Sequence, residues 1–303
     1  MPISDHYELL DFGAGRKLER FGPWVVDRPS PAAQDHAQHR PELWSTAAAR
    51  YERSENQRGS WTRAVEIASE WQVSCGPFAL ELKLTEYGQV GLFPEQADNW
   101  DWIAEQVRAA AAPVKVLNLF AYTGASTLAA AAAGAEVAHV DAAAGVVAWA
   151  RRNAQISGLS EAPVRWITED ARKFVRRELK RGNYYDAVIL DPPSYGHGPG
   201  GEAWKLEEHL DELLAMCGEL TAGRRQFMLL TCHSGELAYA PALLKHTIAH
   251  LPGLREHGRL SGADMRLRSA SGDPLHCGAA VRFSRNEVLA PPRIRPLSKP
   301  AGQ

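Results

Sequence analysis

Residues 114–126 read Val-Lys-Val-Leu-Asn-Leu-Phe-Ala-Tyr-Thr-Gly-Ala-Ser, and this stretch indicates the fold. The apolar run at 114–119 is typical of a strand that is buried on both faces, and Gly124 opens an alanine-rich helical pattern. The same alternation continues to about residue 250. Repeated β-α units require right-handed crossovers, so we predict an α/β fold with a doubly wound, mostly parallel, seven-stranded sheet of the Rossmann-like type.

The two ends of the chain lack this alternation. Residues 1–60 carry scattered prolines and large aromatic residues, which favour short strands. We predict a small β-rich N-terminal domain at 1–95, the α/β domain at 96–290 and a tail at 291–303. The alternation of apolar residues over 78–84 predicts a strand, with 89–93 as the returning strand of a hairpin. Two strands within 255–283, with no helix between them, predict a terminal antiparallel hairpin.

Composition excludes several classes of protein. The 303 residues contain 34 Lys plus Arg and 36 Asp plus Glu, a formal net charge of −2 that argues against a globally basic nucleic-acid binder. We find no run of roughly 18 apolar residues and no secretory pattern in 1–10, so we expect no membrane contact. The four cysteines lie far apart and form no Cys-x-x-Cys pair, which favours a cytoplasmic location.

Acidic residues follow two of the predicted strands close to Gly124. Because ligands bind at the carboxyl ends of parallel strands, Asp141 is placed to accept hydrogen bonds from ribose hydroxyls. Asp170 is placed to accept from an adenine amine, or to cap the helix that begins at Ala171. The stretch around Gly124 lacks Gly-x-Gly-x-x-Gly, so it offers no cradle for a pyrophosphate. These features favour a nucleoside ligand without phosphates over a dinucleotide.

The most specific signal is Asp191-Pro192-Pro193-Ser194-Tyr195, which follows the strand predicted at 185–190. Two prolines stiffen the backbone as it leaves the strand. Such a loop suits a planar base that stacks on Tyr195 and hydrogen-bonds to Asp191. Pro192, Pro193 and Tyr195 are therefore candidate substrate-binding residues.

These motifs, together with 149–153 and 91–96, occur in an order that resembles class I S-adenosylmethionine-dependent methyltransferases. The likeness is to the bacterial 23S ribosomal RNA methyltransferase group, which includes the cytosine-carbon-5 enzymes. It implies S-adenosylmethionine as cofactor, ribosomal RNA as partner and a methyl transfer that needs no metal. The resemblance assigns cofactor contacts or their support to these residues: Gln96, Asn118, Phe120, Ala121, Tyr122, Thr123, Gly124, Asp141, Asn153, Asp170, Ala171 and Asp191.

The resemblance also implies two catalytic residues, Asp191 facing the target base and Cys232 as a nucleophile on carbon 6 of cytosine. Cys232 equally fits a small buried residue at a strand end. Residues 1–70 do not supply the RNA-binding PUA module that is usual in the cytosine enzymes. Three alternatives therefore stay open: transfer to a base nitrogen without a covalent intermediate, an NAD-dependent oxidoreductase, and an RNA-binding factor without turnover.

Two further sequence patterns are weaker indications of a functional site. His36-x-x-His39 has a spacing seen in metal sites but no neighbouring ligand cluster, so we expect no metal there. A basic run at 172–181 places Lys173, Arg176, Arg177 and Lys180 on one helix face. That face is either simply solvated or part of a phosphate-binding surface.

Overall fold

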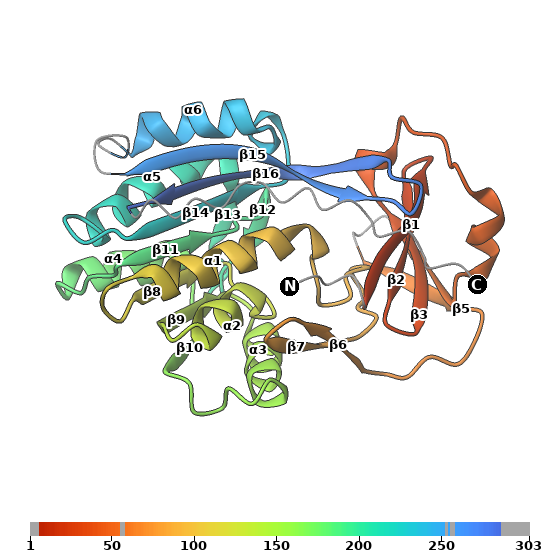
Figure 1. The fold of residues 1–303 in the computed structure, drawn as a ribbon, viewed down its shortest axis with the longest axis horizontal. Coiled ribbons are helices and arrows are strands. Elements are labelled where there is room, and N and C mark those ends of the chain that lie inside the picture. The colour runs from red at the N-terminus through yellow and green to blue at the C-terminus, as the bar shows by residue number, and fades with distance from the viewer. Residues whose placement is uncertain (1–5, 55–57, 252–253, 255–257, 286–303) are drawn as a thin grey trace.

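The computed structural model describes residues 6–54, 58–251, 254 and 258–285, and contains the predicted α/β sheet and a second, N-terminal sheet (Figure 1). The helices are α1 (Ala97–Ala109), α2 (Ala125–Ala132), α3 (Ala144–Ile156), α4 (Ala171–Lys180), α5 (Leu206–Leu220) and α6 (Ala240–His250), with short 3-10 helices η2 (Pro31–Ala33), η3 (Pro41–Thr46), η4 (Pro94–Gln96) and η5 (Glu236–Ala238). Among the described residues, no helix combines the length and the apolar character needed to cross a bilayer.

Strands β1 to β7 precede the first α-helix: β1 (Tyr7–Gly13), β2 (Arg16–Phe21), β3 (Trp24–Pro29), β4 (Ala49–Arg53), β5 (Gly59–Arg63), β6 (Trp71–Cys75) and β7 (Phe78–Leu82). The remaining strands are β8 (Lys115–Leu119), β9 (Glu136–Asp141), β10 (Val164–Thr168), β11 (Ala187–Leu190), β12 (Tyr195–His197), β13 (Ala203–Lys205), β14 (Phe227–Cys232), β15 (Arg259–Arg268) and β16 (Pro274–Ser284).

The seven-stranded sheet has the order β10-β9-β8-β11-β14-β16-β15. Strands β10, β9, β8, β11 and β14 are parallel, whereas β16 is antiparallel to both of its neighbours. The chain reverses direction across the sheet between β8 and β11, so the ends of these strands form the crevice where open α/β sheets bind ligands. The predicted fold class and the terminal antiparallel hairpin are confirmed.

Alternate residues of the central strands enter two separate cores. Leu117 and Leu119 of β8 pack with α4 and α5 on one face, while Val116 packs with α1 and α2 on the other. This period of two follows from the strand geometry, and it explains why these strands are apolar throughout. The sheet is thus covered on both faces, and only its ends are open to a ligand.

The N-terminal strands form a five-stranded sheet of order β1-β2-β3-β4-β5, which lies beyond the ends of the parallel strands (Figure 1). The β15–β16 hairpin reaches this sheet, where Leu9 pairs with Ser269. The domain boundary at residue 95 stays a proposal. The contact between Leu9 and Ser269 joins the N-terminal sheet to a hairpin of the α/β domain, so the two proposed domains are in contact. The predicted tail at 291–303 lies outside the described residues.

The predicted hairpin between 78–84 and 89–93 is wrong. Strand β7 instead pairs with β6, and Gly76 with a φ of +68° lies in the turn. Two backbone hydrogen bonds still hold residues 89 and 90 beside 83 and 85. No strand forms there, because Gly91 has a φ of +99° and Pro94 has no N–H to donate.

Candidate active site

A cleft of about 770 Å³ lies between the carboxyl ends of the parallel strands and the N-terminal sheet. It brings together the three predicted carboxylates, Asp141, Asp170 and Asp191, which follow or end three different strands. Lys17 and Arg28 line the opposite wall, from β2 and β3. A cavity of this size accommodates a nucleoside-sized ligand with further room.

The loop between β8 and α2 has a strained backbone. Phe120 and Tyr122 have φ angles of +56° and +49°, which side chains other than glycine rarely adopt, and Gly124 has a φ of +92°. A Cβ atom at Gly124 would lie 3.1 Å from the Cβ of Ala150 in α3, so the backbone conformation favours glycine and the space for a side chain is tight. Strain of this kind gathers where a backbone must approach a ligand closely.

Three hydrogen bonds that involve side chains hold this loop in place. The Tyr122 N–H donates to Oδ2 of Asp141 at 2.9 Å, and Nδ2 of Asn153 donates to the Thr123 carbonyl oxygen at 2.9 Å. The Thr123 hydroxyl donates to the carbonyl oxygen of Gly91 at 2.8 Å. Asn153 is fully buried and lines neither the cleft nor a smaller cavity of about 40 Å³ beneath the loop. It therefore supports the loop from below.

Asp141 and Asp170 both already accept backbone hydrogen bonds. Oδ1 of Asp141 accepts from the Ala143 N–H at 3.0 Å, and burial raises the pKa of this carboxyl. Asp170 caps α4 by accepting from the Lys173 N–H at 2.9 Å, and it also lines the cleft beside Ala171. The two interpretations of Asp170, helix cap and ligand contact, are thus compatible, since capping uses one of its two oxygens.

Asp191 is held by three side-chain donors. Its Oδ2 accepts from Nε2 of Gln96 at 3.0 Å, and its Oδ1 accepts from the Thr231 hydroxyl at 2.5 Å and from Nε2 of His233 at 2.9 Å. Burial alone would raise the pKa of Asp191, but His233 and these hydrogen bonds outweigh burial and lower it. Asp191 is therefore a fixed carboxylate at the edge of the cleft.

His233 carries a positive charge in this arrangement. Its Nδ1 lies 2.8 Å from the Cys277 carbonyl oxygen and its Nε2 faces Asp191, so both ring nitrogens meet acceptors and both carry hydrogens. Burial lowers the pKa of His233, but the Asp191 carboxylate outweighs that effect and raises it to about 9.

Cys232 does not have the surroundings of a nucleophile. Its side chain is fully buried in the core with α5 and α6, and it lines neither cavity. Burial, together with the Asp191 charge, raises the pKa of the thiol to about 12. A reactive cysteine needs exposure and a lowered pKa, so these surroundings match the core interpretation.

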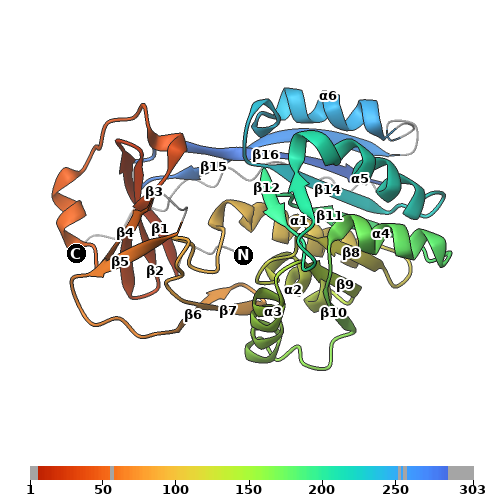
Figure 2. The ribbon, with the colours of Figure 1, turned by 180° about the vertical axis from the view of Figure 1, so that it is seen from behind.

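The loop after Asp191 divides the candidate substrate residues into two groups. Pro192 and Pro193 line the cleft, and the Pro193 carbonyl oxygen accepts from Nε1 of Trp204 at 2.7 Å. Tyr195 does not line the cleft; its ring is 52% exposed and packs edge-on against His197. It belongs to the β12–β13 hairpin, which stands at the end of the large sheet that faces the N-terminal sheet (Figure 2).

Gln96 and Asn118 lie below the loop, whereas Phe120 and Tyr122 belong to the loop and line the large cleft. Asn118 lines the smaller cavity and donates to the Thr127 hydroxyl at 2.9 Å, and Gln96 is likewise buried beneath Asp191. That smaller cavity is also lined by Phe120, Ala121, Tyr122, Thr123 and Gly124.

Sequence reasoning missed Arg28 and Glu95 in the opposite wall. Arg28 is 3% exposed, and its Nε donates to the buried Glu19 at 2.6 Å. Burial alone would raise the pKa of Glu19, but Arg28 and Lys17 lower it to about 2. Nη2 of Arg28 and Oε2 of Glu95 are buried polar atoms without a hydrogen-bond partner among the described residues, and both side chains line the cleft.

The sequence offers a motif that could have pointed to Glu95 but none that points to Arg28. Glu95 lies within the stretch 91–96 that the resemblance used, next to Gln96. Arg28 lies in a separate sheet, where no motif marks it.

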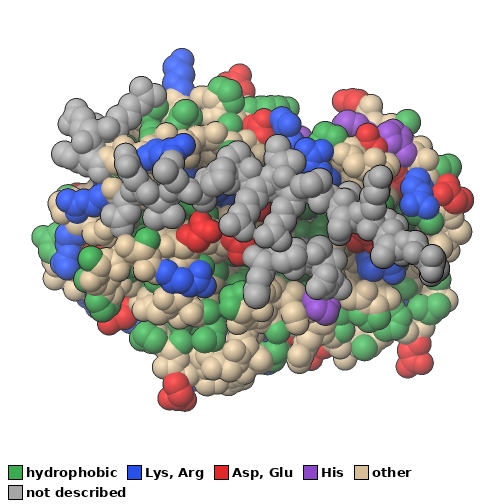
Figure 3. Space-filling view, in the orientation of Figure 1, with side chains coloured by type: hydrophobic (Ala, Val, Ile, Leu, Met, Phe, Trp, Pro, Cys, Tyr) green, Lys and Arg blue, Asp and Glu red, His purple; other side chains and the backbone are tan. Residues whose placement is uncertain are grey.

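The basic face of α4 is neutralised by acids. Lys173 pairs with Glu202, Arg176 pairs with Glu212, and Arg177 pairs with Glu169. On the face shown in Figure 3, basic and acidic side chains are interspersed among the described residues. The expectation of a solvated face therefore fits this helix better than a phosphate-binding surface.

Comparisons with known proteins agree with this geometry. A family model described as S-adenosylmethionine-dependent methyltransferase matches residues 47–262. The crystal structure of a SAM-dependent methyltransferase from Agrobacterium tumefaciens is 34% identical, with a TM-score of 0.86, and the match covers 92% of this chain and 90% of that one.

Two curated relatives match over shorter stretches. Ribosomal RNA large subunit methyltransferase I of Aeromonas salmonicida is 32% identical over 108 residues, 35% of this chain and 26% of the relative. Ribosomal RNA large subunit methyltransferase K/L of Chromohalobacter salexigens is 30% identical over 150 residues, 48% of this chain and 20% of the relative. The matches thus span about a quarter or less of the length of these relatives.

Proposed function

The chain belongs to the S-adenosylmethionine-dependent methyltransferases, and from this membership we propose that it transfers a methyl group to a base in ribosomal RNA. One observation carries the proposal: Asp191 lines the same cleft as Asp141 and Asp170. The donor and its acceptor can thus lie in one cleft at the ends of the parallel strands. The names of the curated relatives support ribosomal RNA as the substrate class.

The residues at the strand ends suit the nucleoside part of the cofactor. We propose that Asp141 accepts hydrogen bonds from the ribose hydroxyls and that Asp170 uses its free oxygen for the adenine amine. The strained turn at Phe120 to Gly124 would lie against the methionine part, with Asn153 supporting it from below.

The unpartnered atoms in the opposite wall suit the amino-acid end of the cofactor. That end carries both a carboxylate and an ammonium group. We propose that Nη2 of Arg28 binds the carboxylate and that Oε2 of Glu95 binds the ammonium, since each atom lacks a hydrogen-bond partner among the described residues and each residue lines the cleft. Glu19 pairs with both Arg28 and Lys17, so these three side chains together with Glu95 carry no net charge, and a zwitterion adds none.

Bound S-adenosylmethionine supplies a methyl group on a sulfonium, which needs only a nucleophile held in line. The protein therefore contributes mainly by holding the nucleophile and the methyl group in line. Such orientation can lower the activation barrier by part of the roughly 7–11 kcal/mol available from it. We propose that Asp191 accepts a hydrogen bond from an amine of the target base and fixes that nitrogen. The N–CH₃ bond forms as the S–CH₃ bond breaks, S-adenosylhomocysteine leaves, and the methylated nitrogen releases its extra proton to water, because the lowered pKa of Asp191 suits an acceptor better than a general base.

Transfer to a base nitrogen is favoured over cytosine carbon 5. The carbon-5 route needs a thiolate, and the burial and raised pKa of Cys232 oppose one. The nitrogen route needs an acceptor that holds an amine beside the donor, which the fixed Asp191 can provide.

The test uses deproteinised large-subunit ribosomal RNA and S-adenosylmethionine with a deuterated methyl group. We expect mass spectrometry of the digested nucleosides to show a labelled base methylated on nitrogen, and Asp191→Ala to abolish the label. Labelled 5-methylcytidine would instead restore the carbon-5 route. If the protein binds the cofactor but no RNA becomes labelled under any condition, the result would favour a different substrate or an RNA-binding factor without turnover.

A further inference from the structure

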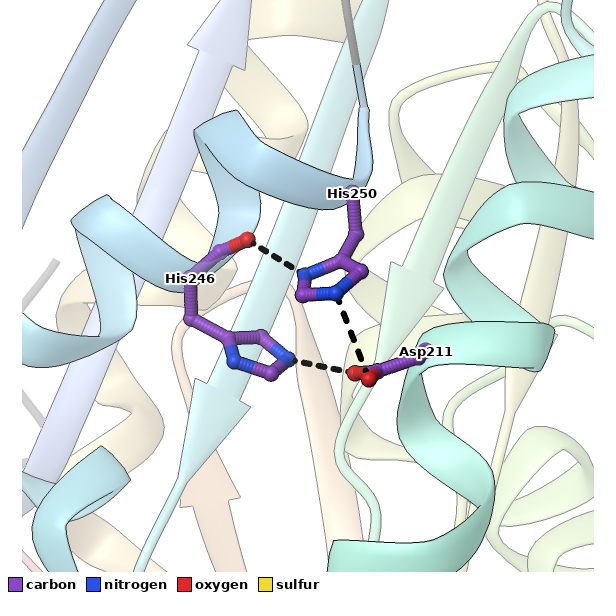
Figure 4. A group of neighbouring side chains, drawn as sticks. All are labelled: Asp211, His246 and His250. Atoms are coloured by element: carbon purple, nitrogen blue, oxygen red, sulfur yellow. Dashed lines mark hydrogen bonds and ion pairs between the residues drawn. The ribbon is translucent and has the colours of Figure 1, made fainter.

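A cluster of three side chains lies outside the candidate active site: Asp211 of α5 and His246 and His250 of α6. None of the three lines either cavity described above. One ligand atom from each lies within 4.8 Å of the others. Both imidazole rings turn from α6 toward the same carboxylate (Figure 4). Nε2 of His246 lies 2.9 Å from Oδ1 of Asp211, and Nε2 of His250 lies 3.2 Å from Oδ2.

The hydrogen bonding of His250 leaves its second nitrogen facing an acceptor. Its Nδ1 lies 2.9 Å from the His246 carbonyl oxygen, and because a carbonyl only accepts, Nδ1 carries a hydrogen. In the neutral ring Nε2 then bears a lone pair, which faces a carboxylate oxygen that also only accepts. A proton on Nε2, as at His233, or a metal cation between the two atoms removes this conflict. The His246 ring, with its centroid 4.4 Å from that of His250, approaches the same carboxylate, and one shared metal cation serves both rings. Metal-binding histidines usually have this arrangement, with one nitrogen bound to a carbonyl and the other free for the metal.

His246 adds a second, independent sign of a missing ligand. Its Nε2 is buried and makes no hydrogen bond with a described residue, although Asp211 lies close to it. The atom is therefore near the carboxylate but off the line that an N–H donor would need. Two histidine Nε2 atoms and one carboxylate thus converge without satisfying one another.

We propose that these three residues form a zinc site that joins α5 to α6. Imidazole nitrogens and a carboxylate oxygen are ligands that Zn²⁺ accepts, and histidines four residues apart on a helix lie on one face. Ligand distances of about 2.0–2.2 Å place tetrahedral ligand atoms about 3.3–3.5 Å apart. The observed separations of 2.9 and 3.2 Å need to open by only a few tenths of an ångström. Asp211 is 55% exposed, so water can complete the coordination.

The sequence did not reveal this cluster, because Asp211 lies 35 residues before His246 on a different helix. The pair that the sequence did point to, His36 and His39, separates in the structure. His36 packs edge-on against Phe12, whereas His39 pairs with Asp273.

Titration calorimetry of the full chain, purified without a histidine tag, tests the proposal with ZnCl₂. We expect one equivalent of zinc to bind and the melting temperature to rise. His246→Asn/His250→Asn should weaken binding at least tenfold and remove the rise. His39→Asn is the matched control, since it removes a histidine that pairs with one carboxylate and belongs to no three-residue ligand group within the described part of the chain, and it should bind zinc as the wild type does.

Two further measurements keep the proposal open to contradiction if the double variant misfolds. Asp211→Asn changes a half-exposed side chain and should also weaken zinc binding. CoCl₂ should give the visible absorption of tetrahedral cobalt with nitrogen and oxygen ligands and no thiolate charge-transfer band. Absence of stoichiometric zinc binding to the wild type, binding that all the variants retain, or a thiolate band would overturn the proposal.

Discussion

Nε2 of His233 lies 2.9 Å from Oδ1 of Asp191, and the same ring reaches the Cys277 carbonyl through Nδ1. The contact joins β11 and its following loop to the end of β14. The contact fixes the carboxylate that we propose holds the target base. Because both ring nitrogens face acceptors, the contact is complete only when His233 is protonated.

This pair predicts a pH-dependent contribution to stability. The folded pKa of His233, about 9, lies above its ordinary value of 6.5, so the stabilisation is complete below about pH 6.5 and is lost as pH rises through about 9. Each side chain is about one third exposed, so we expect His233→Gln to cost about 1–2 kcal/mol near neutral pH. Urea unfolding at about pH 6 and pH 10 measures this difference. An equal cost at both values would contradict the charged pair.

Asp141→Ala is expected to weaken binding of S-adenosylmethionine by tenfold or more, about 1.4 kcal/mol. The substitution removes the proposed ribose acceptor and also frees the Tyr122 N–H, which loosens the strained loop. Asp141→Asn is the control, because it keeps one acceptor oxygen and should lose less. Calorimetry measures both affinities. A wild type that binds no cofactor would contradict the cofactor site as a whole.

Glu95→Gln separates the two ends of the proposed cofactor site. We expect it to lower the affinity for S-adenosylhomocysteine about tenfold, because a charged hydrogen bond to the ammonium is lost. The affinity for 5′-methylthioadenosine, which lacks the amino-acid end, should stay the same. An equal loss for both ligands would place Glu95 outside the amino-acid subsite.

Cys232→Ala is expected to leave turnover within about twofold of the wild type, because the buried thiol takes no part in the proposed nitrogen route. Stability should fall by about 1 kcal/mol, since the side chain fills space in the core with α5 and α6. Single-turnover methylation and urea unfolding give the two quantities. A hundredfold loss of turnover in a folded variant would show that the cysteine acts covalently.

Gly91→Ala and Gly134→Ala form a matched pair. Their φ angles, +99° and +102°, impose a similar backbone strain of about 1–2 kcal/mol on alanine. A Cβ at Gly91 would lie 2.4 Å from the Trp149 ring, whereas nothing lies within 4 Å at Gly134. We therefore expect Gly91→Ala to cost about 1–3 kcal/mol more, measured by thermal or urea unfolding. Equal costs would mean that the ring moves aside freely.

Local patterns predicted the large sheet well. The continuous apolar run at 114–119 and the alternating helices require a parallel sheet covered on both faces, and the structure has one. Asp141, Asp170 and Asp191 follow or end different strands, so their convergence on one cleft also follows from the topology. The hairpin at 78–93 was mispredicted because the alternation of apolar and polar residues indicates a strand but does not indicate which strand pairs with it.

The chain's periodicity and its turn residues determined which elements form and which side chains stand at their ends, because both depend on neighbours in sequence. The tertiary structure alone decided that Cys232 lies in the core, that Arg28 and Glu95 face the carboxylates, and that Asp211 meets two histidines. These contacts depend on which elements pack together. Burial, charge pairing and coordination act through space, between residues that the sequence keeps far apart.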